Sequence, residues 1–596
     1  MAATNKASQD GSRSERWLRP SGGKDLGFDS SVRLLLALFL NFLTLLKLGW
    51  HEPILAESVL YSLQILALAG YGVSLLLSVR AAGDDKQRRA ALLSVTRPEQ
   101  IATLIGLVFC WSPVVLRVAV GVILIIHFAR LFTLLVQTRI PTGLVFLGSF
   151  VLLTLGATGL LMLPASTPTD QPIRFVDALF TITSAISQTG LTMRPTGEGF
   201  TRFGQVVILI AIQVGALGVI VFGALLVTLL GSSFGLRATQ TLAEGTEQGW
   251  AGQLAIQRLV TFIIIFTHSI EAVGAALLFF FWPESWFGMP KDMVTTGDRL
   301  YHSVFFAISS FCNAGFVTTS DSLVSLRGSW TTHVVVGGLI ALGTVGFPVL
   351  DNVREVIWSR LRGHRTREGG SLVRLTLHSK LMLAAFGVAT GVGAVVTGIC
   401  LWVFSDYTAP NAALQGVIMS VNRTAGFSTV EFEELAPLGQ LTMILLMAIG
   451  GAPISAAGGL KFTVLVVLVL TVWSTSLGSA ETTVFGRSIP DQIVRKCATI
   501  ATLWVGMLFI ITAIVTISDP EYPLLVVLYD TTSALATCGL SSGMTGPDLS
   551  TTGKVTLIVA MFVGRVGPFA VLAALVSVAA GRRSRVHYPS EQIAIY

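Results

Sequence analysis

Four short polar stretches, each centred on a glycine, contain the residues whose types and spacing could do chemistry. Each stretch follows a short apolar run, and the glycines recur at intervals of 125, 111 and 113 residues. A dehydrated cation needs a ring of oxygens in place of its hydration shell, and backbone carbonyls can supply that ring. Glycine reaches the positive-φ conformations that such a loop requires. We assign the following residues to a cation filter made of backbone carbonyls: Gln188, Thr189, Gly190, Cys312, Asn313, Ala314, Gly315, Thr424, Ala425, Gly426, Thr537, Cys538 and Gly539.

The fourfold repetition of the glycine stretch favours a filter over simpler explanations of each single stretch. A lone glycine after an apolar run is more often a close helix contact or an outer turn. Four glycines at equivalent places in four repeats favour a pseudo-fourfold ring within one chain. Such a ring would bind a metal cation through its backbone carbonyls.

The elements that position these loops form a unit that repeats four times from residue 139 onward. Each unit has a spanning run (M1), a shorter apolar run (P), the glycine stretch and a second spanning run (M2). The M2 runs are predicted near 204–231, 332–358, 438–473 and 553–580. A run of about 12 residues makes only about 18 Å of helix, whereas a hydrocarbon core is roughly 30 Å thick. The short runs are therefore expected to be re-entrant pore helices. The predicted repeats cover 139–254, 255–376, 377–493 and 494–580.

The predicted fold is an all-α polytopic membrane protein. With 52% hydrophobic residues, 12% charged residues and a mean hydropathy of +0.74, the chain has too little charge to coat a soluble domain of 596 residues. Lipid is the expected surroundings. The basic pI near 9.3 does not indicate nucleic-acid binding, because the basic residues lie in short linkers between apolar runs.

The charges near the helix ends orient the chain. Basic residues that should be cytoplasmic are Arg360, Arg362, Arg365, Arg367, Arg582, Arg583 and Arg585. Acidic residues that should lie outside, where they would concentrate cations at the mouth, are Glu431, Glu433, Glu434, Asp519, Glu521, Asp530 and Asp548. With an even number of spans, the polar tail 1–31 and the tail 581–596 are both expected in the cytoplasm, and the chain in the plasma (inner) membrane.

About four further apolar runs fill residues 32–138, ahead of the repeats. Four helices before a pore suggest a voltage sensor, which carries an arginine at every third position. Arg117 and Arg130 are thirteen residues apart, so the sequence favours a packing or assembly domain.

A glycine-rich segment, GGAPISAAGG, interrupts the second spanning run of the third repeat. Its small residues and Pro453 should not hold a regular helix. A kink packed against a neighbour is one interpretation, and an unwound intramembrane loop that gates the pore below the filter is the one we favour. Arg565 is expected mid-span in the last helix, facing the pore and paired with carbonyls of this loop. The predicted gate residues are Gly450, Gly451, Ser455, Gly458, Gly459, Lys461 and Arg565.

At these motifs the sequence resembles the Trk/Ktr/HKT superfamily of potassium transporters, over about residues 139–596. The resemblance rests on the four filter stretches and on IQVGALGVIVFG, LGTVGFPVL, NRTAGFST, GGAPISAAGGLKFT and GRVGPFAVL. The end, VHYPSEQIAIY, is more similar to the KtrB type than to TrkH. The resemblance implies a gated potassium uptake pore, with K⁺ as substrate, Na⁺ as an activator and no organic cofactor in this chain.

The resemblance also implies an assembly: a homodimer, surrounded by membrane lipid, on a cytoplasmic ring of RCK (KtrA-like) nucleotide-binding subunits. In this superfamily the glycine of the first filter accompanies potassium selectivity, so Gly190 implies potassium. The chain departs from the pattern in two places. Ser187 and Gln188 replace the usual Thr-x before Thr189, and block 1–138 precedes the first repeat.

Other functions need residues that the sequence supplies poorly. A sodium- or proton-coupled symporter needs a carboxylate inside the spans, for which Glu271 and Asp351 are the clearest candidates. A sodium-conducting relative is the further alternative. A membrane enzyme needs clustered polar side chains, but the candidate histidines are dispersed: His127, His268, His302 and His333. The five cysteines have no metal or disulfide spacing.

Overall fold

The structure is a computed structural model that describes residues 25–52, 54–81, 99–137, 142–217, 253–281, 285–286, 289–290, 295–319, 321–361, 374–479 and 481–567. The chain divides into two units, residues 1–135 with 225–234 and residues 136–224 with 235–596. Strands in the described part are limited to two antiparallel hairpins. They pair β1 (Ser285–Trp286) with β2 (Met289–Pro290), and β3 (Thr483–Val484) with β4 (Arg487–Ser488). The fold is therefore built from helices.

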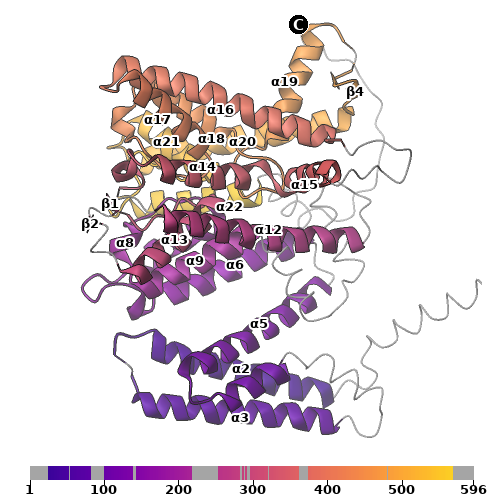
Figure 1. Cartoon of the computed structure of the whole chain (residues 1–596), viewed down its shortest axis with the longest axis vertical. Helices are drawn as coiled ribbons and strands as arrows, with labels where there is room; N and C mark the ends of the chain where they lie inside the picture. The colour runs from indigo at the N-terminus through magenta and orange to yellow at the C-terminus, as the bar shows by residue number, and fades with distance from the viewer. Residues whose placement is uncertain are drawn as a thin grey trace, which may run out of the picture. The chain divides into compact units, whose positions relative to one another are not determined.

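The first unit is a small helical bundle, drawn in indigo and purple in Figure 1. Its helices are α2 (Asp25–Leu48), α3 (Glu57–Ala81), a helix described over residues 99–108, and α5 (Pro113–Gln137). Buried apolar side chains such as Leu40, Leu60 and Ile123 form its core. Helical residues thus lie where the apolar runs of block 32–138 predict them, and their crossing of the membrane stays a prediction.

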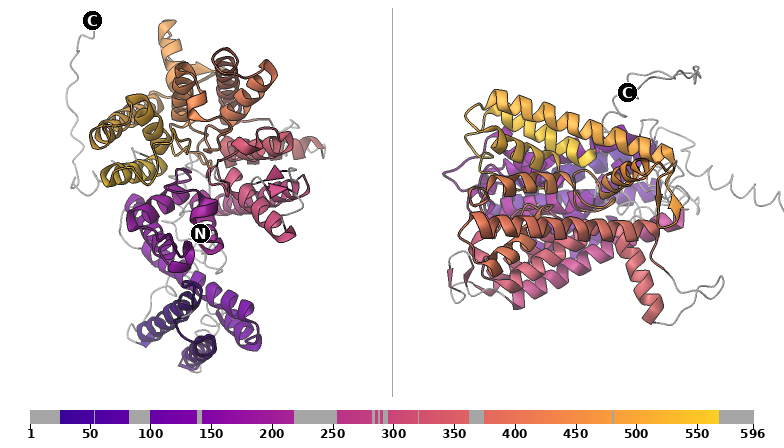
Figure 2. Two further views of the ribbon diagram at one scale, coloured as in Figure 1. Left: turned by 90° about the vertical axis from the view of Figure 1, so that its left-hand side faces the viewer. Right: turned by 90° about the horizontal axis from the view of Figure 1, so that it is seen from above.

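The second unit contains the elements that carry the glycine stretches. Its first half comprises α6 (Thr142–Leu161), η1 (Pro164–Ser166), α7 (Phe175–Ser187), α8 (Thr196–Gly199), α9 (Arg202–Leu217), α12 (Gln253–Phe280), α13 (Thr296–Phe311), η3 (Val324–Leu326), α14 (Trp330–Val345) and α15 (Phe347–Leu361). Its second half comprises α16 (Leu377–Phe404), α17 (Ala409–Asn422), η4 (Phe432–Glu434), α18 (Pro437–Ala448), α19 (Phe462–Ser476), α20 (Asp491–Ser518), α21 (Leu524–Leu535) and α22 (Thr551–Val566). Viewed end-on, these helices form groups that follow one another in chain order around a common centre (Figure 2, left).

Local sequence explains where several of these helices begin. The hydroxyls of Thr295, Thr376 and Ser550 accept the backbone N–H three residues later and so cap α13, α16 and α22. The short helices α7, α13, α17 and α21 occupy the four runs that the sequence predicts to be pore helices. Each leads directly into a glycine stretch.

The longer helices expose apolar side chains on their outer faces, as a lipid-facing helix must. Within the described residues, four helices are long and apolar enough to cross a membrane: 57–77, 261–280, α16 and α20. On α20, Phe509 is 75% exposed and Ile517 is 80% exposed. Large apolar side chains are unfavourable when they are exposed to water and favourable when they face the hydrocarbon core of a bilayer. The second unit is therefore that of a multi-pass membrane protein.

The spanning run predicted near 332–358 is divided into two helices in the structure. The chain breaks between α14 and α15, which meet at an angle of 102°. Gly346 takes φ +92° at the break, and Pro348 lies in the first turn of α15, where proline is tolerated. An apolar run cannot reveal this break, because both helices are apolar at the junction.

The predicted mid-span position of Arg565 stays a prediction, because the second half of that span lies outside the described residues. Helix α22 ends at Val566 and Gly567 takes φ +93°, so Arg565 lies in the last turn of this helix. The remainder of the predicted last span, 568–580, lies outside the described residues, as do 218–231 and the tail 581–596. Of the basic residues predicted to be cytoplasmic, only Arg360 lies in the described part.

Candidate functional site

Three of the four glycine stretches use the same turn at the end of their short helix. A non-glycine residue there takes a left-handed conformation: Gln188 (φ 60°), Asn313 (φ 52°) and Thr537 (φ 48°). The next residue then donates its N–H to a carbonyl five residues earlier, at 2.8 Å in each case. The third stretch differs, because the N–H groups of Ala425 and Gly426 both donate to Asn422 O, at 2.8 and 3.2 Å. The four loops are similar but unequal.

The four glycines themselves are mutual neighbours in a closed ring. An ideal Cβ on Gly190 would lie 3.0 Å from the Cα of Gly315, and one on Gly315 would lie 3.3 Å from the Cα of Gly426. A Cβ on Gly426 would lie 2.9 Å from the Cα of Gly539, and one on Gly539 would lie 3.0 Å from the Cα of Gly190. All four have φ between +70° and +96°. Side chains are therefore excluded from the ring by contact and by conformation.

A serine lies six residues before each glycine, and its side chain supports the loop in three of the four stretches; these serines were not predicted from the sequence. Ser184 Oγ accepts the N–H of Gly190 at 3.0 Å, and Ser533 Oγ accepts the N–H of Gly539 at 2.9 Å. The equivalent serines of the other two stretches, Ser309 and Ser420, donate instead to the carbonyls of Phe316 and Thr390. The shared offset from the glycine was visible in the sequence and could have identified all four.

An open cavity of about 420 Å³ lies against the ring, and all four glycines line it. Three carboxylates, those of Asp321, Glu431 and Glu433, are also part of its lining, which includes no lysine or arginine. Because a cleft lined with one sign of charge concentrates the opposite ion, this cavity favours cations. Glu431 and Glu433 are among the residues that the sequence predicts at the mouth, and Asp321 is not.

Several acidic residues predicted to lie at the mouth have other partners. Asp530 is fully buried and accepts hydrogen bonds from the N–H and Oγ of Ser542, at 2.7 and 2.8 Å. Asp519 is 1% exposed and accepts from the N–H and Oγ of Ser550, at the start of α22. Both carboxylates hold loops in place and are not part of the cavity lining. Their serine donors lie 12 and 31 residues away along the chain, which made the pairings hard to predict.

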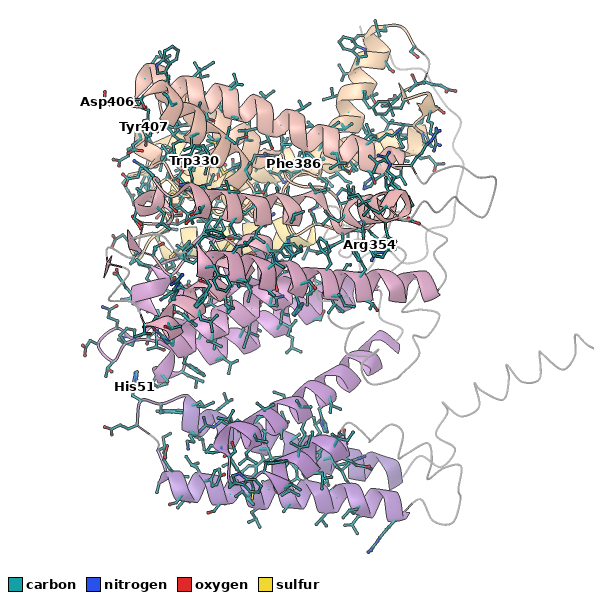
Figure 3. All side chains as sticks on the ribbon, viewed as in Figure 1. His51, Trp330, Arg354, Phe386, Asp406 and Tyr407 are labelled. Atoms are coloured by element: carbon teal, nitrogen blue, oxygen red, sulfur yellow. The ribbon has the colours of Figure 1, made fainter. Side chains whose placement is uncertain are left out.

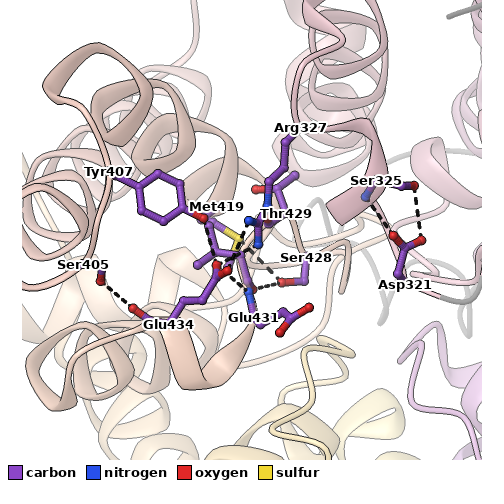
Figure 4. Close-up of polar contacts among 11 residues, drawn as sticks. Asp321, Ser325, Arg327, Ser405, Tyr407, Met419, Ser428, Thr429, Glu431 and Glu434 are labelled. Carbon is purple, nitrogen blue, oxygen red and sulfur yellow. Dashed lines mark hydrogen bonds and ion pairs between the residues drawn. The ribbon is translucent and has the colours of Figure 1, made fainter. Parts of the chain in front are cut away.

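A polar cluster beside the cavity joins the loop that precedes α14 to η4 (Figure 4). Arg327 donates from Nη1 and Nη2 to the two carboxylate oxygens of Glu434, at 3.2 and 2.7 Å, and also donates to Thr429 O. The Tyr407 hydroxyl donates to Glu434 Oε2 at 2.8 Å. Partial burial, then the hydrogen bond to Glu434, raise the pKa of Tyr407 to about 12, so this donor stays protonated. The cluster fixes two loops that line the cavity.

We expect this cluster to stabilise the fold in a pH-dependent way. Partial burial favours the neutral form of Glu434, but hydrogen bonds from Arg327 and Tyr407 outweigh it and hold the carboxyl pKa below its ordinary value. The stabilisation is therefore complete above the unfolded-state pKa and is lost as the pH falls through the folded-state pKa. Glu434→Gln should lower the free energy of unfolding by up to about 1 kcal/mol at neutral pH, and this deficit should shrink toward acid pH.

Thermal unfolding of the detergent-solubilised protein across this pH range measures the effect. Glu433→Gln is the matched control. Glu433 is the exposed neighbour of Glu434, and its carboxylate lacks the bidentate contact that Arg327 makes with Glu434. Equal losses in the two variants at every pH contradict the stabilising role of the cluster.

The predicted gate segment is a buried loop between α18 and α19. Its base is closed by a bridge between Ile449 and Leu460 and by the N–H of Gly450, which donates to Leu460 O at 3.0 Å. Ala452 and Ala456 are at most 2% exposed. A Cβ on Gly450 would lie 1.8 Å from Gly458 O, so the two arms of the loop require glycine at this crossing.

Two cationic side chains contact carbonyls of this loop. Arg565 donates from Nη1 to Ala456 O at 2.7 Å and from Nη2 to Gly215 O of α9 at 3.0 Å. Lys461 Nζ donates to Ala457 O at 2.6 Å. Arg565 thus connects the loop to the helix that follows the first glycine stretch.

The loop also packs directly against the glycine stretches. A Cβ on Gly458 would lie 1.8 Å from Thr537 Oγ1, and the N–H of Ala452 donates to Thr344 O at 3.1 Å. The Thr344 hydroxyl in turn contacts Asn313 Nδ2 at 2.9 Å and Thr424 Oγ1 at 3.0 Å. A displacement of the loop would therefore also move residues of the second, third and fourth glycine stretches.

A buried ion pair that the sequence analysis missed ties the first pore helix to the last helix. Lys554 Nζ of α22 lies 2.8 Å from Asp177 Oδ1 of α7, and both side chains are nearly buried. Removing one partner of such a pair leaves an uncompensated charge, so the contact holds the two helices in register.

The carboxylates considered for ion coupling do not line the cavity. Glu271 is 6% exposed and is hydrogen-bonded to Gln213. Asp351 pairs with Arg354 at 2.6 Å, and Arg354 lies at the opposite end of the second unit from Tyr407 (Figure 3). The described residues contain no group of three or more His, Cys, Asp or Glu side chains arranged to hold a metal ion.

Comparison with known proteins identifies what the chain is similar to. The family model described as "TrkH: Cation transport protein" matches residues 137–580. The chain is 33% identical over 459 residues to the Ktr system potassium uptake protein B of Bacillus subtilis, covering 76% of this chain and 96% of that protein. It is 31% identical over 473 residues to the potassium/sodium uptake protein NtpJ of Enterococcus hirae, with the same coverage.

A solved structure supports the fold at lower sequence similarity. The crystal structure of the potassium transporter TrkH from Vibrio parahaemolyticus superposes with a TM-score of 0.56. The match covers 86% of this chain and 97% of that one at 16% identity. Helices before residue 137 lie outside the family match.

Proposed function

Because the chain belongs to the TrkH family of cation transport proteins, we propose that it carries K⁺ through a filter made by its four glycine stretches. The observation that carries this proposal is the cavity whose lining includes Gly190, Gly315, Gly426 and Gly539 together. Carbonyls around such a ring can replace the hydration shell of a cation. The family is one of ion transporters, which agrees with a protein that catalyses no covalent chemistry.

Potassium is proposed as the substrate because the Bacillus relative is named for potassium uptake. The Enterococcus relative is named for potassium and sodium, so Na⁺ is a competitor or activator to be tested. The four stretches form an approximate fourfold ring, with unequal turns at their entrances. Such a ring offers fewer equivalent carbonyls than four identical subunits would, and its selectivity should be correspondingly looser.

Gating is assigned to the loop from Gly450 to Gly459, with Lys461 and Arg565. The contacts of the loop with Thr344 and Thr537 support a control point directly behind the filter. Arg565 bridges the loop to Gly215, which would hold the closed state in place.

Membrane orientation and assembly complete the proposal. The acidic cavity faces outward, both termini lie in the cytoplasm, and the protein resides in the plasma membrane. The relative named as part of a Ktr system supports a multi-subunit assembly. We expect a homodimer with a cytoplasmic RCK nucleotide-binding partner.

Gly190→Ser tests the filter assignment. A Cβ at this position would lie 2.8 Å from Ala314 O, and φ is +96°, so the serine displaces the neighbouring stretch. We expect the preference for K⁺ over Na⁺ to fall about tenfold, which corresponds to about 1.4 kcal/mol. Ion competition for uptake in a host deficient in potassium uptake measures this preference. Competition curves identical to those of the wild type contradict the proposal.

A further inference from the structure

A buried carboxylate lies behind the second glycine stretch and has no part in the proposed ion path. Glu271 of α12 accepts hydrogen bonds from Gln213 Nε2 to both of its oxygens, each at 3.1 Å. Cys312 Sγ lies 3.5 Å from Glu271 Oε1. Burying a carboxylate is costly, and a site that contains one must satisfy it with donors. The amide and the thiol do so here.

The cluster reaches the filter through Cys312. This residue is fully buried, ends α13 and directly precedes Asn313, whose left-handed turn leads to Ala314 and Gly315. Its Sγ lies 3.6 Å from Gln213 Oε1, so the thiol is held between the two polar side chains. Because the thiol is held, the backbone at the entrance of the second stretch has little freedom to shift.

The cluster of Gln213, Glu271 and Cys312 lies next to the hydrogen bond between Arg565 and the Gly215 carbonyl. Gln213 is two residues before Gly215, and the Gly215 carbonyl accepts from Arg565. A Cβ on Gly215 would lie 2.0 Å from Ile186 O, so α9 packs closely against the end of α7 at this level. The position of Gln213 is thus fixed by two neighbouring elements, and Gln213 in turn orients Glu271.

We propose that Glu271 is a positioning residue that acts with Gln213 through Cys312 to set the geometry of the second filter stretch, and that this pair is a determinant of ion selectivity. The inference rests on the proposed filter function. Glu271 does not touch the ion, because it is not part of the cavity lining. Its effect is on the spacing of carbonyl oxygens, to which discrimination between K⁺ and Na⁺ is sensitive.

A swap of the two side chains tests this role. Glu271→Gln turns one of the two oxygens that accept from Gln213 into an NH₂ donor and removes the charge, and Gln213→Glu leaves two carboxylates facing each other. The double variant Gln213→Glu/Glu271→Gln restores an amide–carboxylate pair with the direction of donation reversed. We expect each single variant to lower the K⁺/Na⁺ flux ratio about fivefold, and the double variant to recover most of the wild-type ratio.

The measurement is tracer flux through the full-length purified protein in liposomes, with K⁺ and Na⁺ exchanged. Wild-type ratios in both single variants, or losses that simply multiply in the double variant, overturn the inference. Absence of K⁺ preference in the wild type instead contradicts the proposed function itself, so the two failures are distinguishable.

A second pair of variants covers the case in which a single variant does not fold. Cys312→Ser keeps a hydroxyl donor toward Glu271, whereas Cys312→Ala removes the donor, so the Ala variant should lower the ratio further than the Ser variant does. Equal ratios in these two variants also overturn the inference.

Discussion

Gly539→Ala is expected to abolish potassium uptake. An ideal Cβ at this position lies 1.9 Å from Thr189 O and 3.0 Å from the Cα of Gly190, so the methyl group cannot fit without moving the first glycine stretch. The contact is with backbone, which cannot rotate away as a side chain could. We expect the rate of uptake to fall by more than about a hundredfold, as for other groups that set a site to within an ångström. Uptake by cells that depend on this protein for potassium measures the effect.

Gly543→Ala is the matched control for backbone strain. Gly543 also has φ +93° and lies four residues further along the same loop, but nothing lies within 4 Å of its Cβ position. Alanine there costs about 1 kcal/mol of strain and should leave most of the uptake. Similar losses in the two variants would mean that strain, and not the close approach of the four glycines, explains the result.

Arg565→Gln is expected to raise the flux through the unstimulated protein. The arginine donates to Ala456 O and Gly215 O, and the variant loses one or both of these charged hydrogen bonds. A charged hydrogen bond contributes about 1.5–3 kcal/mol, so its loss should shift the equilibrium toward the open state by about tenfold or more. Flux from proteoliposomes without a cytoplasmic partner measures the basal opening.

Arg565→Lys separates the charge from the two-point contact. Lysine keeps the positive charge, but its single ammonium lacks the planar fork that reaches both carbonyls. We expect an intermediate basal flux. Lower flux in the Gln variant than in the wild type would show that Arg565 supports the open pore, contrary to its assignment as a barrier.

The sequence predicts a helix best where the length of its apolar run is enough to decide whether the helix can span the bilayer. The runs that became α7, α13, α17 and α21 are too short to span a bilayer, and the loop after α18 contains too many small residues for a helix. The break at Gly346 was missed, because an apolar run looks continuous when the chain turns between two apolar helices. The packing of Pro453 O near Gly346 comes from a segment about a hundred residues away, which local patterns do not encode.

The functional site likewise contains residues that a local motif identifies and residues that only the packing of distant segments brings together. The filter residues are contiguous and recur, so a motif identifies them. The support of the filter is not contiguous: Arg327 pairs with Glu434 across 107 residues, and Lys554 pairs with Asp177 across 377 residues. For the same reason Glu271 was considered only as an ion-coupling residue. Its neighbours Gln213 and Cys312 become visible only when α9, α12 and α13 are packed together.

Flux from purified full-length protein in liposomes, with K⁺ and Na⁺ exchanged, tests the central claim most directly. The ring of four glycines predicts that this chain alone conducts K⁺ in preference to Na⁺, and that Gly539→Ala removes this flux while Gly543→Ala retains it. A flux that favours Na⁺, or one that survives Gly539→Ala unchanged, contradicts a filter formed by the four glycine stretches.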